Sequence, residues 1–302
     1  MPADRPLLGI LLMIGFCALA PMGDAIAKVL GATIPLGQLL TVRFAVQVVV
    51  LLPIALWTGR QLVMSRRVFR LTAVRTILHI VGVGAMFTSL RYLPLADAVA
   101  IAFVMPFIML LLGKLVLDEQ IGARRMIACA IGFIGTLLVV QPSFAAVGWP
   151  ALWPVLVAVV FALFMLVTRQ MAKEVDPISL QVVSGMMATG ILTLTLLATS
   201  QLELQPLGLV MPTGREAALL ATIGVIGSVA HLLMTWSLRF APSATLAPMQ
   251  YLEIPFATLF GWLIFRDLPN GLAAIGIVIT IAAGLYVVFR ERSIARRTAP
   301  VV

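Results

Sequence analysis

Five charged side chains fall inside long apolar stretches of this sequence, where a charge needs a specific reason. They are Asp24, Lys28, Arg43, Arg75 and Glu253. A charge at the centre of a membrane helix costs about 2.5–3.5 kcal/mol on insertion scales, and such residues mark substrate or ion pathways or pair with one another. These five residues are therefore the first candidates for chemistry.

The strongest local signal surrounds Glu253. The segment from Pro248 to Pro255 reads PMQYLEIP and holds Gln250, Tyr251 and Glu253 between two prolines. Proline has no N–H to donate, so Pro248 and Pro255 should free the carbonyls of Ala244 and Tyr251, four residues earlier, and kink the helix. Irregular backbone at membrane depth is tolerated where it lines protein or a cavity. We therefore predict that Gln250, Tyr251 and Glu253 bind substrate or couple its movement to an ion.

Pro106 occupies the place of Pro255 in an earlier apolar run. The two kinks should face each other around a central cavity. A dry environment favours the neutral form of a carboxylic acid, which makes Glu253 a candidate for proton exchange. The alternative is that the prolines serve only helix packing and that Glu253 pairs with Arg43 or Arg75.

Asp24 and Lys28 are four residues apart and share one helix face, so they can pair directly. Arg43 in the next run should lie at a similar depth, with Gln47 on its face. We predict that these four residues form a gate, with salt bridges among the charged ones that break and reform. The alternative is a static cluster near the outer surface, with Lys28 extending to the headgroups.

Arg75 and His79 are also four apart, and His231 lies near the middle of a later run. All three are candidates for substrate binding or ion coupling. The alternative is that Arg75 extends to the membrane interface and that the histidines are hydrogen-bonded packing residues.

The elements that must position these residues are membrane helices. Of the 302 residues, 62% are hydrophobic and 11% are charged, far from the balance of a soluble domain. Runs of about 20 apolar residues span a bilayer. We predict ten helices, at 7–29, 36–57, 69–90, 95–116, 122–141, 150–172, 177–199, 215–238, 243–265 and 271–290.

The basic residues set the orientation. With the N-terminus inside, fifteen lysines and arginines fall in cytoplasmic segments and three in outer loops. This asymmetry predicts that both termini are cytoplasmic. The net charge of +9 is spread over short connections and forms no continuous basic patch, which argues against a nucleic-acid partner.

The chain repeats itself. SLRYLPLA at Ser89–Ala96 returns as SLRFAPSA at Ser237–Ala244, and the match continues to later prolines, aspartates and glycines. We divide the chain into repeats at 1–146 and 147–302. Because each has five helices, the second must be inverted relative to the first, a common construction of secondary transporters.

Further residues resemble one family. The two Leu-Arg-aromatic-x-Pro junctions resemble the drug/metabolite transporter superfamily with paired EamA domains. Gly23-Asp24, Lys28, Arg43-Phe44, Arg75 and the IGFIG segment at 131–135 are similar to its branch of bacterial riboflavin and S-adenosylmethionine carriers. The resemblance implies a multi-pass protein of the bacterial inner membrane that moves a small metabolite.

Two other classes of function compete with a carrier, namely a membrane enzyme and a channel, and the sequence shows no repeated filter or ring of charges typical of a channel. No catalytic motif and no phosphate-cradling glycine loop is visible, which argues against a membrane enzyme and against ATP-driven transport. Cys17 and Cys129 lie within apolar runs and suggest no metal site, and we expect no cofactor. The prediction is a secondary transporter of a polar or heterocyclic metabolite, such as riboflavin, with an amino-acid or drug exporter as the alternative.

Overall fold

The computed structural model describes residues 5–118, 122–140, 148–199 and 207–266, and thirteen residues between 271 and 289. In chain order the helices are α1 (Pro6–Leu30), α2 (Leu36–Trp57), α3 (Arg66–Ser89), α4 (Leu95–Ala102), α5 (Met105–Leu117), α6 (Ala123–Val140), α8 (Leu152–Met171), α9 (Pro177–Thr199), α10 (Gly214–Phe240), α11 (Ser243–Gln250) and α12 (Glu253–Phe260). A 3₁₀ turn (Trp149–Ala151) precedes α8, and a π-helical turn (Gly261–Phe265) follows α12. These regions contain no strand, which confirms the prediction of an all-helical protein.

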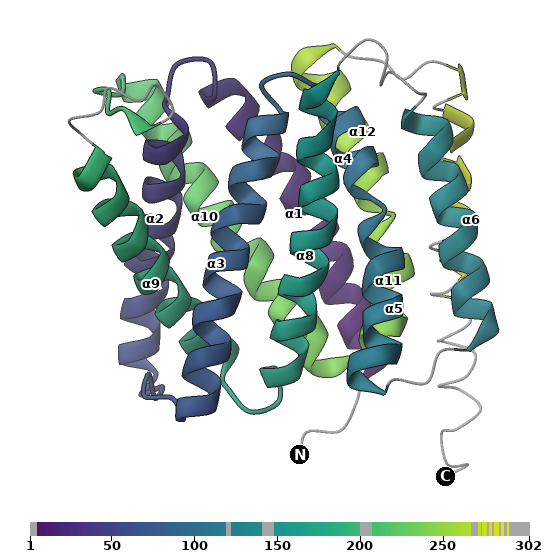
Figure 1. Cartoon of the computed structure of the whole chain (residues 1–302), viewed down its shortest axis with the longest axis horizontal. Helices are drawn as coiled ribbons and strands as arrows, with labels where there is room; N and C mark the ends of the chain where they lie inside the picture. Colours follow the sequence, from purple (N-terminus) through teal and green to yellow (C-terminus); the bar gives the residue numbers. More distant parts are fainter. Residues whose placement is uncertain are drawn as a thin grey trace.

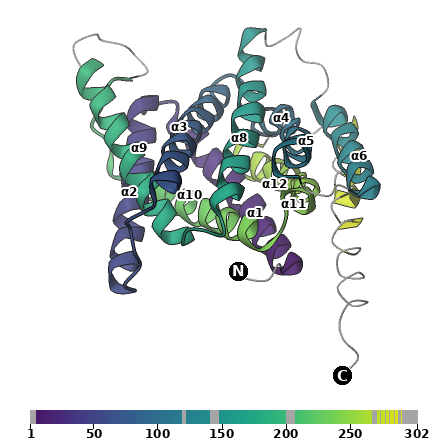
Figure 2. The ribbon, with the colours of Figure 1, turned by 60° about the horizontal axis from the view of Figure 1, so that its bottom comes forward.

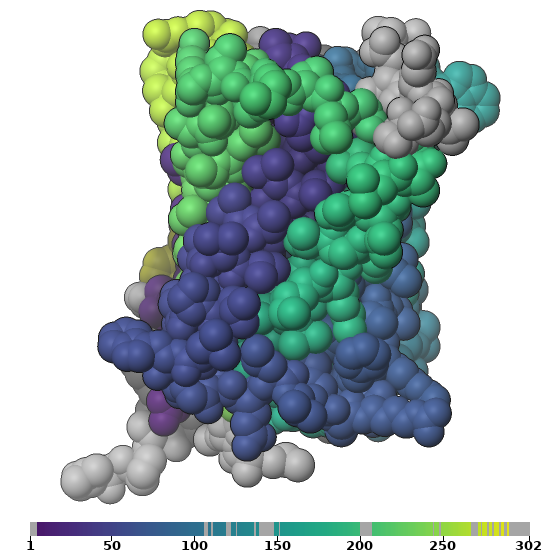
Figure 3. Space-filling model, turned by 90° about the vertical axis from the view of Figure 1, so that its left-hand side faces the viewer, coloured from purple at the N-terminus to yellow at the C-terminus, as the bar shows by residue number. Residues whose placement is uncertain are grey.

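Six helices are long and apolar enough to cross a membrane, counted over the described residues: α1, α2, α3, α8, α9 and α10. The main helices stand side by side (Figure 1). Figure 3 shows the face on which α2 and α9 lie next to each other. Large apolar side chains point outward from these two helices, including Val49 at 70% exposed and Leu194 at 68% exposed. Such a surface suits lipid and confirms a multi-pass membrane protein.

The predicted helices at 95–116 and 243–265 are both interrupted. The first divides into α4 and α5 around residues 103–104, and the second into α11 and α12 around residues 251–252. Pro106 and Pro255 follow these breaks and lie in the first turns of α5 and α12. A proline fits there because first-turn N–H groups have no partner inside their helix.

Two details of the predicted kinks are wrong. The carbonyl of Tyr251 is not freed by Pro255, because the N–H of Ile254 donates to it at 3.3 Å. Pro248 lies within α11, which continues through it without interruption. The break therefore falls between the two prolines rather than at each of them.

The two interrupted segments pack against each other. α4 contacts α12, and α5 contacts α11, so the breaks lie close together near the middle of the bundle (Figures 1 and 2). The most extensive other contacts join α1 with α10, α3 with α8 and α2 with α9. Each pair takes one helix from either half of the chain.

Ion pairs join the two halves at the end of the bundle where the described chain begins (Figure 1). Arg60 in the α2–α3 connection pairs with Asp176 in the α8–α9 connection, and Arg67 pairs with Glu174. Asp176 also accepts hydrogen bonds from the first N–H groups of α9. These contacts fix the two connections against each other.

Gly132 on α6 allows a close approach to the break in the ninth predicted helix. A Cβ atom at this position would lie 2.5 Å from Cδ2 of Tyr251, whose ring is completely buried. Gly132 is therefore a close-packing position between α6 and this break. Only hydrogen fits there without moving the ring.

We predict that Gly132→Ala destabilises the protein, because overpacking a well-filled core costs about 1–3 kcal/mol. Thermal unfolding in detergent measures the effect. Gly190→Ala is the matched control, since Gly190 is exposed on α9 and no atom lies near its added methyl group. Equal transition temperatures for the two variants would contradict the prediction.

Candidate functional site

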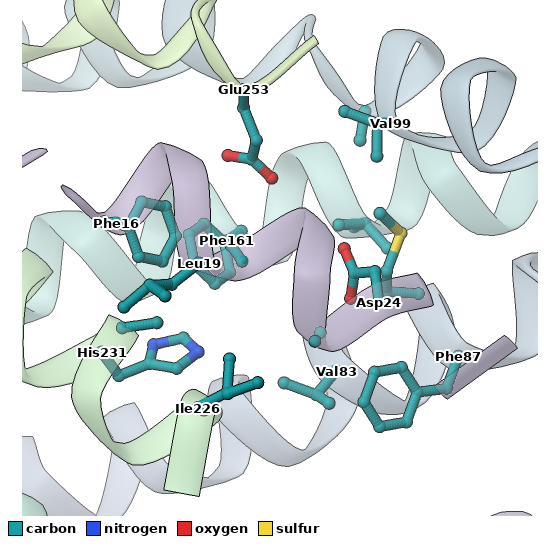
Figure 4. Close-up of a pocket in the computed structure, with 18 of the residues that line it drawn as sticks. Phe16, Leu19, Asp24, Val83, Phe87, Val99, Phe161, Ile226, His231 and Glu253 are labelled. Carbon is teal, nitrogen blue, oxygen red and sulfur yellow. The ribbon is translucent and has the colours of Figure 1, made fainter. Parts of the chain in front are cut away.

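A pocket lies at the two helix interruptions. Phe103 and Met105 line it from the break between α4 and α5, and Glu253 from the first turn of α12. Side chains of α1, α2, α3, α8 and α10 complete the wall. Figure 4 shows Glu253 pointing into this space, with Asp24 and His231 around it. The polar lining residues thus come from separate helices.

Two carboxylates face the pocket. Asp24 comes from α1 and Glu253 from α12, and Glu253 is only 7% exposed. Within the described regions, neither side chain has a hydrogen-bond or ion-pair partner. The alternative in which Glu253 pairs with Arg43 or Arg75 is therefore wrong for this structure. Both carboxylates remain available to a ligand or a proton.

Arg43 of α2 supplies a cation to the same pocket. Its side chain is 5% exposed, and Nη1 has no hydrogen-bond partner among the residues described. The guanidinium lies 5.0 Å from the ring centre of Phe44 and interacts electrostatically with Asp24. No nitrogen of the Arg43 guanidinium lies within 4.0 Å of an Asp24 carboxylate oxygen in the described structure. A carboxyl group and a guanidinium thus face one pocket without direct contact.

Gln47 lies one turn beyond Arg43 and is 1% exposed, so both side chains face the interior of the bundle. Its Nε2 donates to the carbonyl of Gln181 at 2.7 Å. Gln181 in turn donates to Thr235 at 3.2 Å. Gln47 therefore ties α2 to α9 rather than lining the pocket.

Lys28 lies at the end of α1, outside the pocket lining. Its Nζ donates to the carbonyl of Leu93 at 2.7 Å and lies 5.2 Å from the ring centre of Phe265. Lys28 thereby joins α1 to the α3–α4 connection. Its role in a gate stays a prediction.

His79 and His231 form a buried pair that connects α3 to α10. Their Nε2 atoms are 3.1 Å apart, so one ring donates an N–H hydrogen bond to the other. His231 lines the pocket, and His79 lies behind it with no exposed surface. Both Nδ1 atoms lack partners within the described part of the chain.

Arg75 lies one turn before His79 on α3 and is not among the residues that line the pocket. It is completely buried, donates to Thr168 at 2.9 Å and to Ser184 at 3.1 Å, and lies 4.5 Å from the ring centre of Phe164. The alternative in which Arg75 extends to the membrane interface is therefore wrong. Its hydrogen bonds join α3 to α8 and α9.

The predicted group of Gln250, Tyr251 and Glu253 is divided by the helix break. Gln250 donates to the sulfur of Met165 at 2.8 Å, and the Tyr251 hydroxyl lies 3.6 Å from Sγ of Cys129. Only Glu253 lines the pocket. Residues three apart share a face only in a continuous helix, and the turn at 251–252 ends that periodicity.

Aromatic side chains form much of the remaining wall, and the sequence analysis did not single them out. They are Phe16, Phe87, Phe103 and Phe161. Phe16 lies two turns before Gly23 on α1, and both residues line the pocket. Helical spacing from the segment around Gly23 and Asp24 could therefore have identified Phe16. The pairing of His79 with His231 had no comparable signal, because 152 residues separate them.

The fold and the pocket define a helical membrane protein with an internal polar site. The chain belongs to the EamA-like transporter family, whose model matches residues 7–141 and 148–290. The resemblance to the drug/metabolite transporter superfamily is thereby confirmed. A solved crystal structure also shares the fold, with a TM-score of 0.70 at 19% identity over 95% of this chain and 98% of the other.

Curated relatives are named as transporters. The riboflavin transporter of Rhizobium johnstonii is 30% identical over 74% of this chain and 72% of its own length. An S-adenosylmethionine uptake transporter of Rickettsia felis is 26% identical over 91% of this chain and 90% of its own. The pseudopaline exporter of Pseudomonas aeruginosa is 25% identical over 86% and 88%, respectively. The riboflavin and S-adenosylmethionine names match the branch that the sequence resembles.

We predict that His79→Leu and His231→Leu each destabilise the protein, because each leaves one buried ring without its hydrogen-bond partner. An unsatisfied buried polar group costs about 1–3 kcal/mol. The double variant should cost less than the two single changes together. Thermal unfolding in detergent gives the three values, and additive losses would show that the two rings act independently.

Proposed function

We propose that this protein is a secondary transporter that moves a small polar or heterocyclic metabolite by alternating access. The observation that carries the proposal is the pocket, where Asp24, Arg43 and Glu253 face shared space without a salt bridge among them. Charged groups held this way inside a membrane bundle serve a ligand or a coupling ion. Membership of a transporter family supports the same conclusion.

The lining favours a planar substrate with polar edges. Four phenylalanines offer stacking surfaces, while two carboxylates and a guanidinium offer hydrogen bonds of both kinds. Relatives named for riboflavin and for S-adenosylmethionine uptake carry heterocycles of this type. We propose uptake of a riboflavin-like vitamin as the activity to test first.

Export is the second candidate. The relative named as a pseudopaline exporter covers most of both chains, so this family likeness includes outward transport. An amino-acid or drug exporter would use the same pocket from the cytoplasmic side. A membrane enzyme is a remote third candidate, and the transporter names of the relatives agree with a protein that is not an enzyme.

We further propose that the chain crosses the membrane ten times as two inverted repeats, 1–146 and 147–302. The two matches to the family model support this division, although its boundary lies outside the described residues. Each interrupted segment, α4 with α5 and α11 with α12, counts as one crossing. The helical residues described between 271 and 286 support a tenth crossing.

In this proposal Glu253 and His231 contact the substrate or exchange a proton, and Asp24 with Arg43 forms a gate. His79 and Arg75 support the pocket from behind, as do Gln47, Gln250 and Tyr251 from the neighbouring helices. No nucleotide-binding motif is visible in the sequence. Transport would then follow the substrate gradient or an ion gradient.

The proposed location is the bacterial inner membrane, with both termini in the cytoplasm. We predict that a green fluorescent protein fused after Val302 fluoresces, because that protein matures in the cytoplasm. Alkaline phosphatase fused at Pro35 should be active, because the α1–α2 connection would face outward. An inactive phosphatase at Pro35 together with an active one at Val302 would reverse the topology.

We predict saturable entry of labelled riboflavin into proteoliposomes, with an initial rate that responds to an imposed pH gradient. Glu253→Gln should lower that rate about tenfold, equivalent to about 1.4 kcal/mol, and should remove the response to the gradient. The change replaces the acid by an amide of nearly equal size.

Unlabelled S-adenosylmethionine and amino acids serve as competitors, and protein-free liposomes as the blank. Entry of an amino acid in place of riboflavin would keep the transporter and discard the vitamin. Normal, pH-responsive transport by Glu253→Gln would remove the acid from the mechanism.

A further inference from the structure

The guanidinium of Arg43 lies against bare backbone. At Gly227 on α10, an added Cβ atom would be 2.9 Å from Nε, 2.9 Å from Nη2 and 3.1 Å from Cζ of Arg43. All three nearest atoms belong to this one side chain. Gly227 and Arg43 both line the pocket. The guanidinium therefore lies in the space that a side chain at position 227 would occupy.

A second glycine on the same helix shows the contrast. Gly224, three residues earlier, would place its Cβ atom 2.4 Å from Cβ of Val46 and is not part of the pocket lining. Its neighbour is a stiff apolar side chain close to the α2 backbone. Gly224 therefore serves the packing of α2 on α10, whereas Gly227 accommodates the charged end of a long side chain.

The surroundings of Arg43 show where it would move if this space were filled. A methyl group at Gly227 would force the guanidinium away from α10, and the pocket that Arg43 already lines is space into which it can move. In the present position Nη1 has no hydrogen-bond partner among the residues described. A salt bridge between Arg43 and Asp24 would occupy the guanidinium and withdraw it from a substrate oxygen.

We propose that Gly227 is a positioning residue that sets the selectivity of the pocket. It lets Arg43 rest on α10, so that the guanidinium binds an anionic oxygen group of the substrate, with a carboxylate as the first choice. Charge-assisted bonds between a guanidinium and a carboxylate are among the stronger hydrogen bonds in proteins. The inference rests on the proposed transport function, within which it favours a substrate that bears a carboxylate, such as S-adenosylmethionine, over riboflavin; its geometry does not rest on that function.

The geometry is tested without any substrate. The melting temperature in detergent is measured for Gly227→Ala and Gly224→Ala, each alone and combined with Arg43→Ala. The effect of Gly227→Ala should differ between the two backgrounds by about 2 °C or more, because removing Arg43 removes the clash. The effect of Gly224→Ala should be the same in both. An effect of Gly227→Ala that does not depend on Arg43 would overturn the inference.

The selectivity is tested in proteoliposomes with labelled S-adenosylmethionine, which carries a carboxylate, and labelled riboflavin, which carries none. Gly227→Ala should raise the KM for S-adenosylmethionine about tenfold, equivalent to about 1.4 kcal/mol, with little change in maximal rate. The KM for riboflavin should change less. Gly227→Ala combined with Arg43→Lys, whose ammonium is smaller, should recover part of the affinity.

The control variants separate positioning from folding. Gly224→Ala should lower the yield of folded protein while leaving both KM values unchanged. Gly190→Ala on the outer face should change neither the yield nor the KM values. Unchanged KM values in Gly227→Ala would overturn the inference. If neither compound enters with the wild type, the proposed substrates are wrong, and the melting temperatures still decide whether Gly227 positions Arg43.

Discussion

The structure depends on keeping ionisable groups inside an apolar helical bundle without pairing them in salt bridges. Salt bridges among Asp24, Arg43 and Glu253 would offset part of the desolvation cost of these groups, but they would also occupy the groups that the site offers. Instead these groups face one pocket from three different helices. Each helix must therefore be fixed by contacts elsewhere, since the charged groups do not hold one another.

The fixing contacts are polar and lie behind the pocket. Gln47 binds Gln181 on α9, Arg75 binds hydroxyl groups on α8 and α9, and His79 binds His231 on α10. Inside a membrane protein such bonds are individually modest, but they set which faces meet. They join helices from opposite halves of the chain. This interlocking allows the halves to share one site, as transporters built from repeats do.

The two helix breaks decide which residues reach the pocket. The break after α11 directs Glu253 inward while Gln250 and Tyr251 pack against α8 and α6. The break after α4 brings Phe103 into the same wall. Both breaks precede a proline in the first turn of the next helix, where an N–H group would have no partner inside the helix. Irregular backbone is tolerated at this depth because it lies within protein.

The sequence by itself determined the helical membrane class, the family, the repeated junctions and most charged positions of the site. The membrane class and the charged positions follow from apolar run length, helical spacing and the cost of buried charge, which are all local, whereas the family follows from resemblance. The tertiary structure alone decided that His79 meets His231 and that Gly227 receives Arg43. It also decided that Gln250 and Tyr251 face away from the pocket. These outcomes depend on how helices far apart in the chain rotate and pack, and no local pattern encodes that rotation.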